Sequence, residues 1–156
     1  MMLMLLFSIG ASRYALPARD VIEIIPLVNL RPVPKAPAGI AGVFNYRGVV
    51  APAIDMRAAL EGKPSQPLFS TRILIVNGAR DGEARPLGLI VERASDAVEL
   101  PDSEAQSTGV TSPDAPYLAA VHHYDGAMVQ RIDPLLLLPE SIRETLFQEI
   151  KENTVL

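Results

Sequence analysis

The chain has 156 residues, of which 49% are hydrophobic and 21% are charged, and its formal net charge is −4. This hydrophobic fraction excludes an intrinsically disordered protein, and the absence of cysteine excludes disulfides, zinc–thiolate sites and thiol nucleophiles. The 14 basic residues are scattered, so the chain lacks the basic patch that binding to a nucleic-acid backbone requires.

The first segment, MMLMLLFSIG, imitates a secretory signal because its apolar residues begin at position 1. A signal peptide carries basic residues before its apolar core, whereas the first basic residue here is Arg13. A membrane-spanning helix needs about 20 apolar residues, and this run is much shorter. We therefore expect a buried strand here, no membrane insertion, and a location in the cytoplasm.

Short apolar runs separated by glycine and proline continue along the chain, and this spacing is typical of small barrels or a sandwich. The predicted strands are Leu3–Ile9, Tyr14–Pro17, Val21–Pro26, Leu30–Val33, Val43–Tyr46, Val49–Ile54, Arg72–Val76, Pro86–Val91, Ala97–Leu100, Leu118–His123 and Met128–Ile132. A helical turn is expected around Met56–Leu60. The fold class is therefore mainly β with a few short helices.

Helical patterns reappear at the end of the chain. Asp133 and Pro134 have the residue types of an N-cap and first helical position. Ser141 and Glu144 have capping-box spacing, and Ile142, Leu146 and Ile150 repeat every four residues, which predicts a C-terminal amphipathic helix. The polar segment Asp102–Tyr117 is too long for a simple turn, and we expect it to be mobile.

The sequence Asn45-Tyr46-Arg47-Gly48 joins two of the predicted strands. Asn at the first position and Gly at the fourth predict a type I turn, with Gly48 at positive φ. Tyr46 and Arg47 would then be the central residues and would project toward a partner. Tyr and Arg are the residue types most enriched among interface anchors.

Candidate catalytic residues are few. His122, His123 and the loop Asp102–Tyr117 could be imagined in a small metal-dependent hydrolase, but adjacent strand residues point to opposite faces and cannot share one ion. No serine lies in a nucleophile-elbow pattern. The sequence therefore favours a binding module that is not an enzyme, with no cofactor or metal.

Two stretches resemble one known family. LLFSIGASRYALPARDVIEIIPL and VPKAPAGIAGVFNYRGVVAPAIDMRAAL strongly resemble the chemotaxis coupling protein family, the CheW-like domain, with a looser match that extends the resemblance to roughly Leu3–Leu138. The matching residues are Gly10, Tyr14, Val21-Ile22-Glu23-Ile24, Pro34, Gly42, Asn45, Arg47, Gly48, Pro52 and Asp55. One departure is Tyr46, where the family usually has Leu.

The resemblance implies a single domain of two intertwined five-stranded SH3-like barrels. We expect the first barrel at about 10–60, the second at about 70–132, and a helical segment at 133–151. It also implies a scaffold of bacterial chemosensory signalling that couples the signalling tip of a methyl-accepting chemoreceptor to the regulatory domain of a CheA-type histidine kinase. The alternative is a CheW-like regulator of a pilus, surface-motility or other non-flagellar kinase pathway.

The predicted partner-binding residues lie on one strand and on the hairpin. They are Val21, Glu23, Asn45, Tyr46, Arg47 and Gly48. Glu23 shares a strand face with apolar neighbours, where an unpaired carboxylate is costly. We therefore predict that Arg47 turns back to pair with Glu23, within hydrogen-bonding distance and partly exposed.

Overall fold

The computed structural model describes residues 1–37, 39–78, 85–101 and 118–137. Its strands are β1 (Met2–Ile9), β2 (Ser12–Pro17), β3 (Val21–Pro26), β4 (Ile40–Tyr46), β5 (Val49–Asp55), β6 (Arg72–Asn77), β7 (Pro86–Val91), β8 (Arg93–Leu100), β9 (Leu118–Tyr124) and β10 (Ala127–Ile132). The helices are η1 (Ala18–Asp20), α1 (Met56–Glu61) and η3 (Pro134–Leu136). The predicted C-terminal helix and the loop Asp102–Tyr117 lie outside the described residues.

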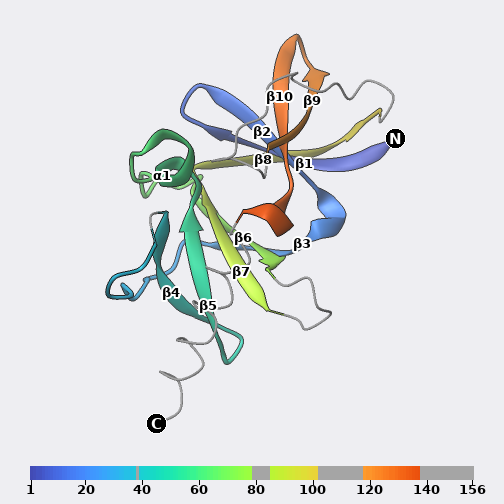
Figure 1. Ribbon diagram of the computed structural model, residues 1–156. Coiled ribbons are helices and arrows are strands. Elements are labelled where there is room, and N and C mark those ends of the chain that lie inside the picture. Colours follow the sequence, from blue (N-terminus) through green and yellow to red (C-terminus); the bar gives the residue numbers. More distant parts are fainter. Residues whose placement is uncertain (38, 79–84, 102–117, 138–156) are drawn as a thin grey trace.

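The strands form two five-stranded sheets. Sheet A has the order β8-β1-β2-β10-β9 and sheet B has the order β3-β6-β7-β5-β4. Read in these orders, both sheets have the same succession of pairings: antiparallel, antiparallel, parallel, antiparallel. Sheet A occupies the upper half of Figure 1 and sheet B the lower half. The mainly β architecture of two SH3-like units is therefore confirmed.

The chain is divided between the sheets differently from the expected barrels at 10–60 and 70–132. Sheet B takes its strands from 21–91, and sheet A takes its strands from 2–17 and 93–132. The reason is the parallel pairing of β10 with β2, which returns the end of the described chain to its beginning. The two units are therefore intertwined along the sequence.

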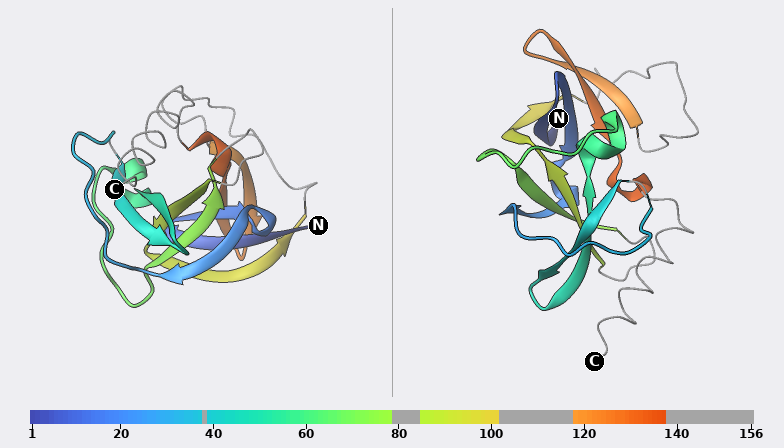
Figure 2. Two further views of the ribbon diagram at one scale, coloured as in Figure 1. Left: turned by 90° about the horizontal axis from the view of Figure 1, so that it is seen from below. Right: turned by 90° about the vertical axis from the view of Figure 1, so that its left-hand side faces the viewer.

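The largest core cluster lies between the two sheets. Phe7 and Leu16 of sheet A pack with Leu74 and Leu89 of sheet B, and all four are almost completely buried. Burying such a side chain contributes about 1.5–3 kcal/mol relative to leaving it exposed. A smaller cluster fills each unit, one around Phe44 in sheet B and one of residues from sheet A. This shared core holds the two units together, and Figure 2 shows the two units side by side from two further directions.

Most strands appear where the apolar runs predict them, including the buried N-terminal strand β1. The predicted strand Leu30–Val33 is wrong, because only Arg31 forms a β-bridge there, with Val43. Pro32 lies within this segment and Pro34 follows it, and proline has no N–H to donate to a strand ladder. The predicted helical turn around Met56 is confirmed as α1, whose N-cap is Asp55.

The polar residue Gln130 has a structural role in β10. The pairing of β10 with β9 shifts register between Gln130 and Ile132. The side-chain amide of Gln130 donates to the carbonyl oxygens of Ala119 at 2.7 Å and of Arg131 at 2.9 Å. Because a bulge leaves backbone groups outside the ladder, this amide satisfies carbonyl oxygens that the irregular pairing would otherwise expose.

Candidate partner-binding surface

The hairpin between β4 and β5 has a two-residue turn. Tyr46 pairs with Val49, so Arg47 and Gly48 form the turn, with φ of 52° and 85°. These angles are those of a type I′ turn, whose twist matches that of the flanking strands. The predicted type I turn centred on Tyr46 and Arg47 is therefore wrong, whereas the positive φ of Gly48 is confirmed. Asn45 Oδ1 accepts a hydrogen bond from the backbone N–H of Gly48 at 2.8 Å.

Tyr46 does not project away from the protein as the type I turn had predicted. Its side chain is half-buried and packs against the core cluster of sheet B, because Tyr46 is the last residue of β4 and not part of the turn. Its hydroxyl donates a hydrogen bond to Glu23 Oε2 at 2.6 Å. Arg47, by contrast, is at the tip, and 73% of its side chain is exposed.

The predicted pairing of Arg47 with Glu23 is confirmed. Arg47 Nη2 lies 2.9 Å from Glu23 Oε2, and the Glu23 side chain is 33% exposed. The Arg47 guanidinium carbon also lies 5.6 Å from the centre of the Tyr46 ring, within the range of a cation–π interaction. Glu23, Tyr46 and Arg47 thus form one cluster, which we call the seam cluster.

The seam cluster joins two strands that are far apart in the sheet order. β3 and β4 are the first and last strands of sheet B, so the hydrogen bond from Tyr46 to Glu23 links the two edges of the sheet. The backbone of Arg31 and Val43 forms a second contact along this seam, with two hydrogen bonds of 2.8 Å. A Cβ on Gly42 would lie 2.6 Å from the Arg31 oxygen, which explains why glycine is needed there.

Hydrogen bonding within the seam cluster shifts the pKa values of Glu23 and Tyr46. The Tyr46 hydroxyl, followed by Arg47, lowers the pKa of Glu23 below its ordinary value of 4.5. The same hydrogen bond raises the pKa of Tyr46 above 10.0. Because the pKa of Glu23 is depressed, its stabilising effect is present above pH 4.5 and is lost as the pH falls through the folded-state pKa. The carboxylate is therefore ionised at neutral pH.

The structure brings together most of the predicted partner-binding residues. Asn45 and Gly48 shape the turn that carries Arg47, beside Tyr46 and Glu23. Val21 is separate from this cluster, because its side chain packs against the core between the sheets.

The outer face of β3 carries exposed apolar residues that the sequence analysis did not single out. Ile22 is 60% exposed and Ile24 is 45% exposed. Their alternation with Glu23 was the sequence signal that could have shown their exposure, because successive strand residues point to opposite faces.

A second hairpin repeats the geometry of the first. Asp125 and Gly126 join β9 to β10 with φ of 51° and 74°, and Tyr124 pairs with Ala127 as Tyr46 pairs with Val49. The two hairpins occupy the same place in the two sheet orders. The repeated pattern Tyr-X-Gly was the sequence signal for this equivalence, and it was missed. The turn of the second hairpin carries an acidic residue where the first carries Arg47.

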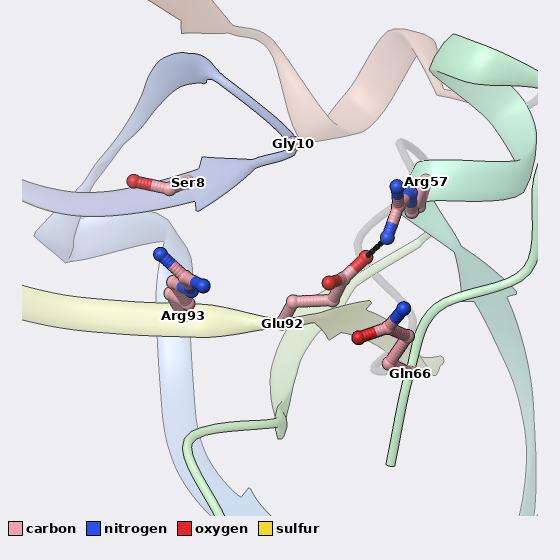
Figure 3. A pocket seen from close by; sticks show the side chains of 6 residues that line it. All are labelled: Ser8, Gly10, Arg57, Gln66, Glu92 and Arg93. Carbon is pink, nitrogen blue, oxygen red and sulfur yellow. Dashed lines mark hydrogen bonds and ion pairs between the residues drawn. The ribbon is translucent and has the colours of Figure 1, made fainter. Parts of the chain in front are cut away.

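A polar pocket of about 290 Å³ lies where the chain passes from sheet B to sheet A (Figure 3). Its lining consists of Ser8, Gly10, Arg57, Gln66, Glu92 and Arg93. Arg57 Nη1 lies 2.7 Å from Glu92 Oε1, and Arg57 Nε lies 3.3 Å from Glu61 Oε2. Glu92, followed by Glu61, raises the pKa of Arg57. The Arg57–Glu92 pair joins α1 to the junction between β7 and β8, whereas the Arg57–Glu61 pair lies within α1.

His122 and His123 face opposite ways, as predicted from their adjacency. His122 is 2% exposed, whereas His123 is exposed. Among the residues that the structure describes, no three His, Cys, Asp or Glu side chains gather where they could hold a metal ion. In the same part of the chain, no helix is both long enough and apolar enough to span a membrane.

Comparisons with known proteins agree with this fold. A family profile described as a CheW-like domain matches residues 3–141. The chain is 28% identical over 140 residues to a chemotaxis protein CheW from Rhizobium meliloti, covering 88% of each chain. It is 35% identical over 104 residues to a chemotaxis protein CheW from Bacillus subtilis, covering 67% of this chain and 64% of that one.

The fold is also similar to a solved structure. The crystal structure of the scaffolding protein TtCheW from Thermoanaerobacter tengcongensis matches with a TM-score of 0.78 and 24% sequence identity, covering 88% of each chain. At this identity the match supports the fold alone.

Proposed function

The chain belongs to the CheW-like domain family, and on that premise we propose that it is a scaffold that couples chemoreceptors to a CheA-type histidine kinase. Its partners would be the signalling tip of a methyl-accepting chemoreceptor and the regulatory domain of the kinase. The protein would act in the cytoplasm, by binding alone and without catalysis. The observation that carries it is the seam cluster, in which an exposed arginine is held by Glu23 and Tyr46 on a domain with this family's fold.

The geometry of the seam cluster suits a binding surface. Arg47 is exposed on a tight turn, while Glu23 and Tyr46 hold its side chain from below. A side chain that is already ordered loses less conformational entropy when a partner binds. The exposed Ile22 and Ile24 lie on the same strand as Glu23 but point to its opposite face, so they are not part of the seam cluster. We therefore propose Glu23, Tyr46 and Arg47 as the centre of the partner-binding surface, with Asn45 and Gly48 shaping it.

Val21 has a different place in this proposal. It lies on β3 two residues before Glu23, and its side chain packs against the core between the sheets. We propose that Val21 supports the position of β3 and does not itself anchor a partner.

Binding measurements with the two separate partners test this function. Calorimetry or a pull-down should show the wild-type chain binding the kinase regulatory domain and a receptor signalling hairpin, each with a Kd around micromolar or weaker. Glu23→Ala and Arg47→Ala should each weaken binding with little change in melting temperature, because both side chains are largely or partly exposed. Their double variant should lose less than the sum of the two.

The second hairpin supplies a matched control. Asp125→Ala changes a charged residue at the equivalent turn position but lies outside the seam cluster. Asp125→Ala should bind both partners with the affinity of the wild type, whereas Arg47→Ala should bind them more weakly. If the wild-type chain binds neither partner, the scaffold proposal is wrong. Binding to a kinase of a pilus or surface-motility pathway, and not to a chemotaxis kinase, would support the alternative output instead.

A further inference from the structure

Tyr46 gives the seam cluster a feature that an aliphatic residue could not supply. Its ring is held by the core of sheet B, so its hydroxyl has a fixed position. The hydroxyl and Arg47 Nη2 both bind the same oxygen of Glu23, at 2.6 Å and 2.9 Å. Two donors on one oxygen restrict the rotation of the carboxylate more than one donor can. The position of the Arg47 guanidinium is therefore set by Glu23 and by the face of the Tyr46 ring.

Arg47 retains unused capacity for hydrogen bonding. A guanidinium has five N–H donors in a planar fork, and only Nη2 of Arg47 has an ion-pair partner in the described part of the chain. Arg57 shows what such a group can hold, because it binds two carboxylates, those of Glu92 and Glu61. Arg47 holds one carboxylate, and 73% of its side chain is exposed. The place for a second carboxylate is therefore open to solvent.

We propose that Arg47 binds a carboxylate of the docked partner, and that the Tyr46 hydroxyl positions the guanidinium for this contact by holding Glu23 at the barrel seam. This inference rests on the proposed scaffold function and adds the chemistry of the partner. Tyr46 acts through Glu23 and is a positioning residue. An aliphatic side chain at this place would leave Glu23 with one donor and Arg47 without an aromatic face.

Tyr46→Phe is the decisive variant, because it keeps the ring and its packing and removes only the hydroxyl. We expect a Kd about 3- to 10-fold weaker for the kinase regulatory domain or for the receptor signalling hairpin, measured by calorimetry with each probe alone. Tyr124→Phe is the matched control, because Tyr124 occupies the equivalent position of the second hairpin and its hydroxyl makes no hydrogen bond within the described residues. It should bind like the wild type.

Two further measurements separate positioning from a general structural effect. In the free protein, the carboxyl pKa of Glu23, followed by NMR, should rise toward its ordinary value in Tyr46→Phe. In a Glu23→Gln background, Tyr46→Phe should cause a much smaller additional loss of affinity. An unchanged Glu23 titration, or an equal loss in the Glu23→Gln background, would overturn the positioning role.

The partner carboxylate is located by a second set of variants. Each surface Asp or Glu of the bound probe is changed to Asn or Gln and measured against wild-type and Arg47→Gln chains. One position should weaken the wild-type complex about 5-fold or more and have little effect on the Arg47→Gln complex. If no position behaves in this way, or if Tyr46→Phe binds like the wild type, the inference is wrong while the scaffold function stands. If the wild type binds neither probe, both are wrong.

Discussion

Replacing Gly48 by alanine tests how the turn geometry serves the binding surface. Gly48 has φ of 85°, and a Cβ built there would meet no atom within 4 Å. The cost of Gly48→Ala is therefore the backbone strain of a left-handed residue alone, which is about 1–2 kcal/mol. For a domain of this size, about 2–4 °C of melting temperature corresponds to each kcal/mol, so the expected decrease is about 2–8 °C.

The free energy of unfolding is measured by urea denaturation, and the affinity for the partner by calorimetry. Gly126→Ala is the matched control, because Gly126 also has a positive φ, of 74°, and open space at its Cβ position. Both variants should lose similar stability, but only Gly48→Ala should lose partner affinity, because only its turn carries Arg47. Unchanged stability of Gly48→Ala, or an equal loss of affinity in Gly126→Ala, would refute this reasoning.

Two other predictions concern the interior. Gly88→Ala should lower the free energy of unfolding by about 1–3 kcal/mol, because its Cβ would lie 2.8 Å from both Ile73 Cγ2 and Phe44 Cε1. Partner affinity, measured at a temperature where the variant is folded, should be unchanged. A melting curve like that of the wild type would contradict this tight packing around Gly88. Glu92→Gln should lower the melting temperature more than Glu61→Gln, because the Glu92 side chain is 7% exposed and that of Glu61 is 32% exposed. Equal effects of the two variants in differential scanning calorimetry would show that the burial of Glu92 is unimportant for stability.

Local sequence patterns predicted the elements and one contact of the surface. Val21–Pro26 and Pro86–Val91 are strands with the predicted bounds, because short apolar runs bounded by polar or turn-forming residues specify short strands directly. The Glu23–Arg47 pair was also predictable, since a carboxylate among apolar strand neighbours needs a nearby cation. The positive φ of Gly48 followed from the turn chemistry of its neighbours.

Tertiary structure decided what depends on distant segments. β2 pairs with β10, and no local preference in Ser12–Pro17 identifies a partner more than a hundred residues away in the numbering. The turn is type I′ because the paired strands around it are twisted, so Tyr46 belongs to a strand and its hydroxyl reaches Glu23. Barrel closure brings β3 against β4, the two ends of one sheet. The sequence determined which residues are apolar, charged or turn-forming, whereas closure of the barrel determined which of them share a surface.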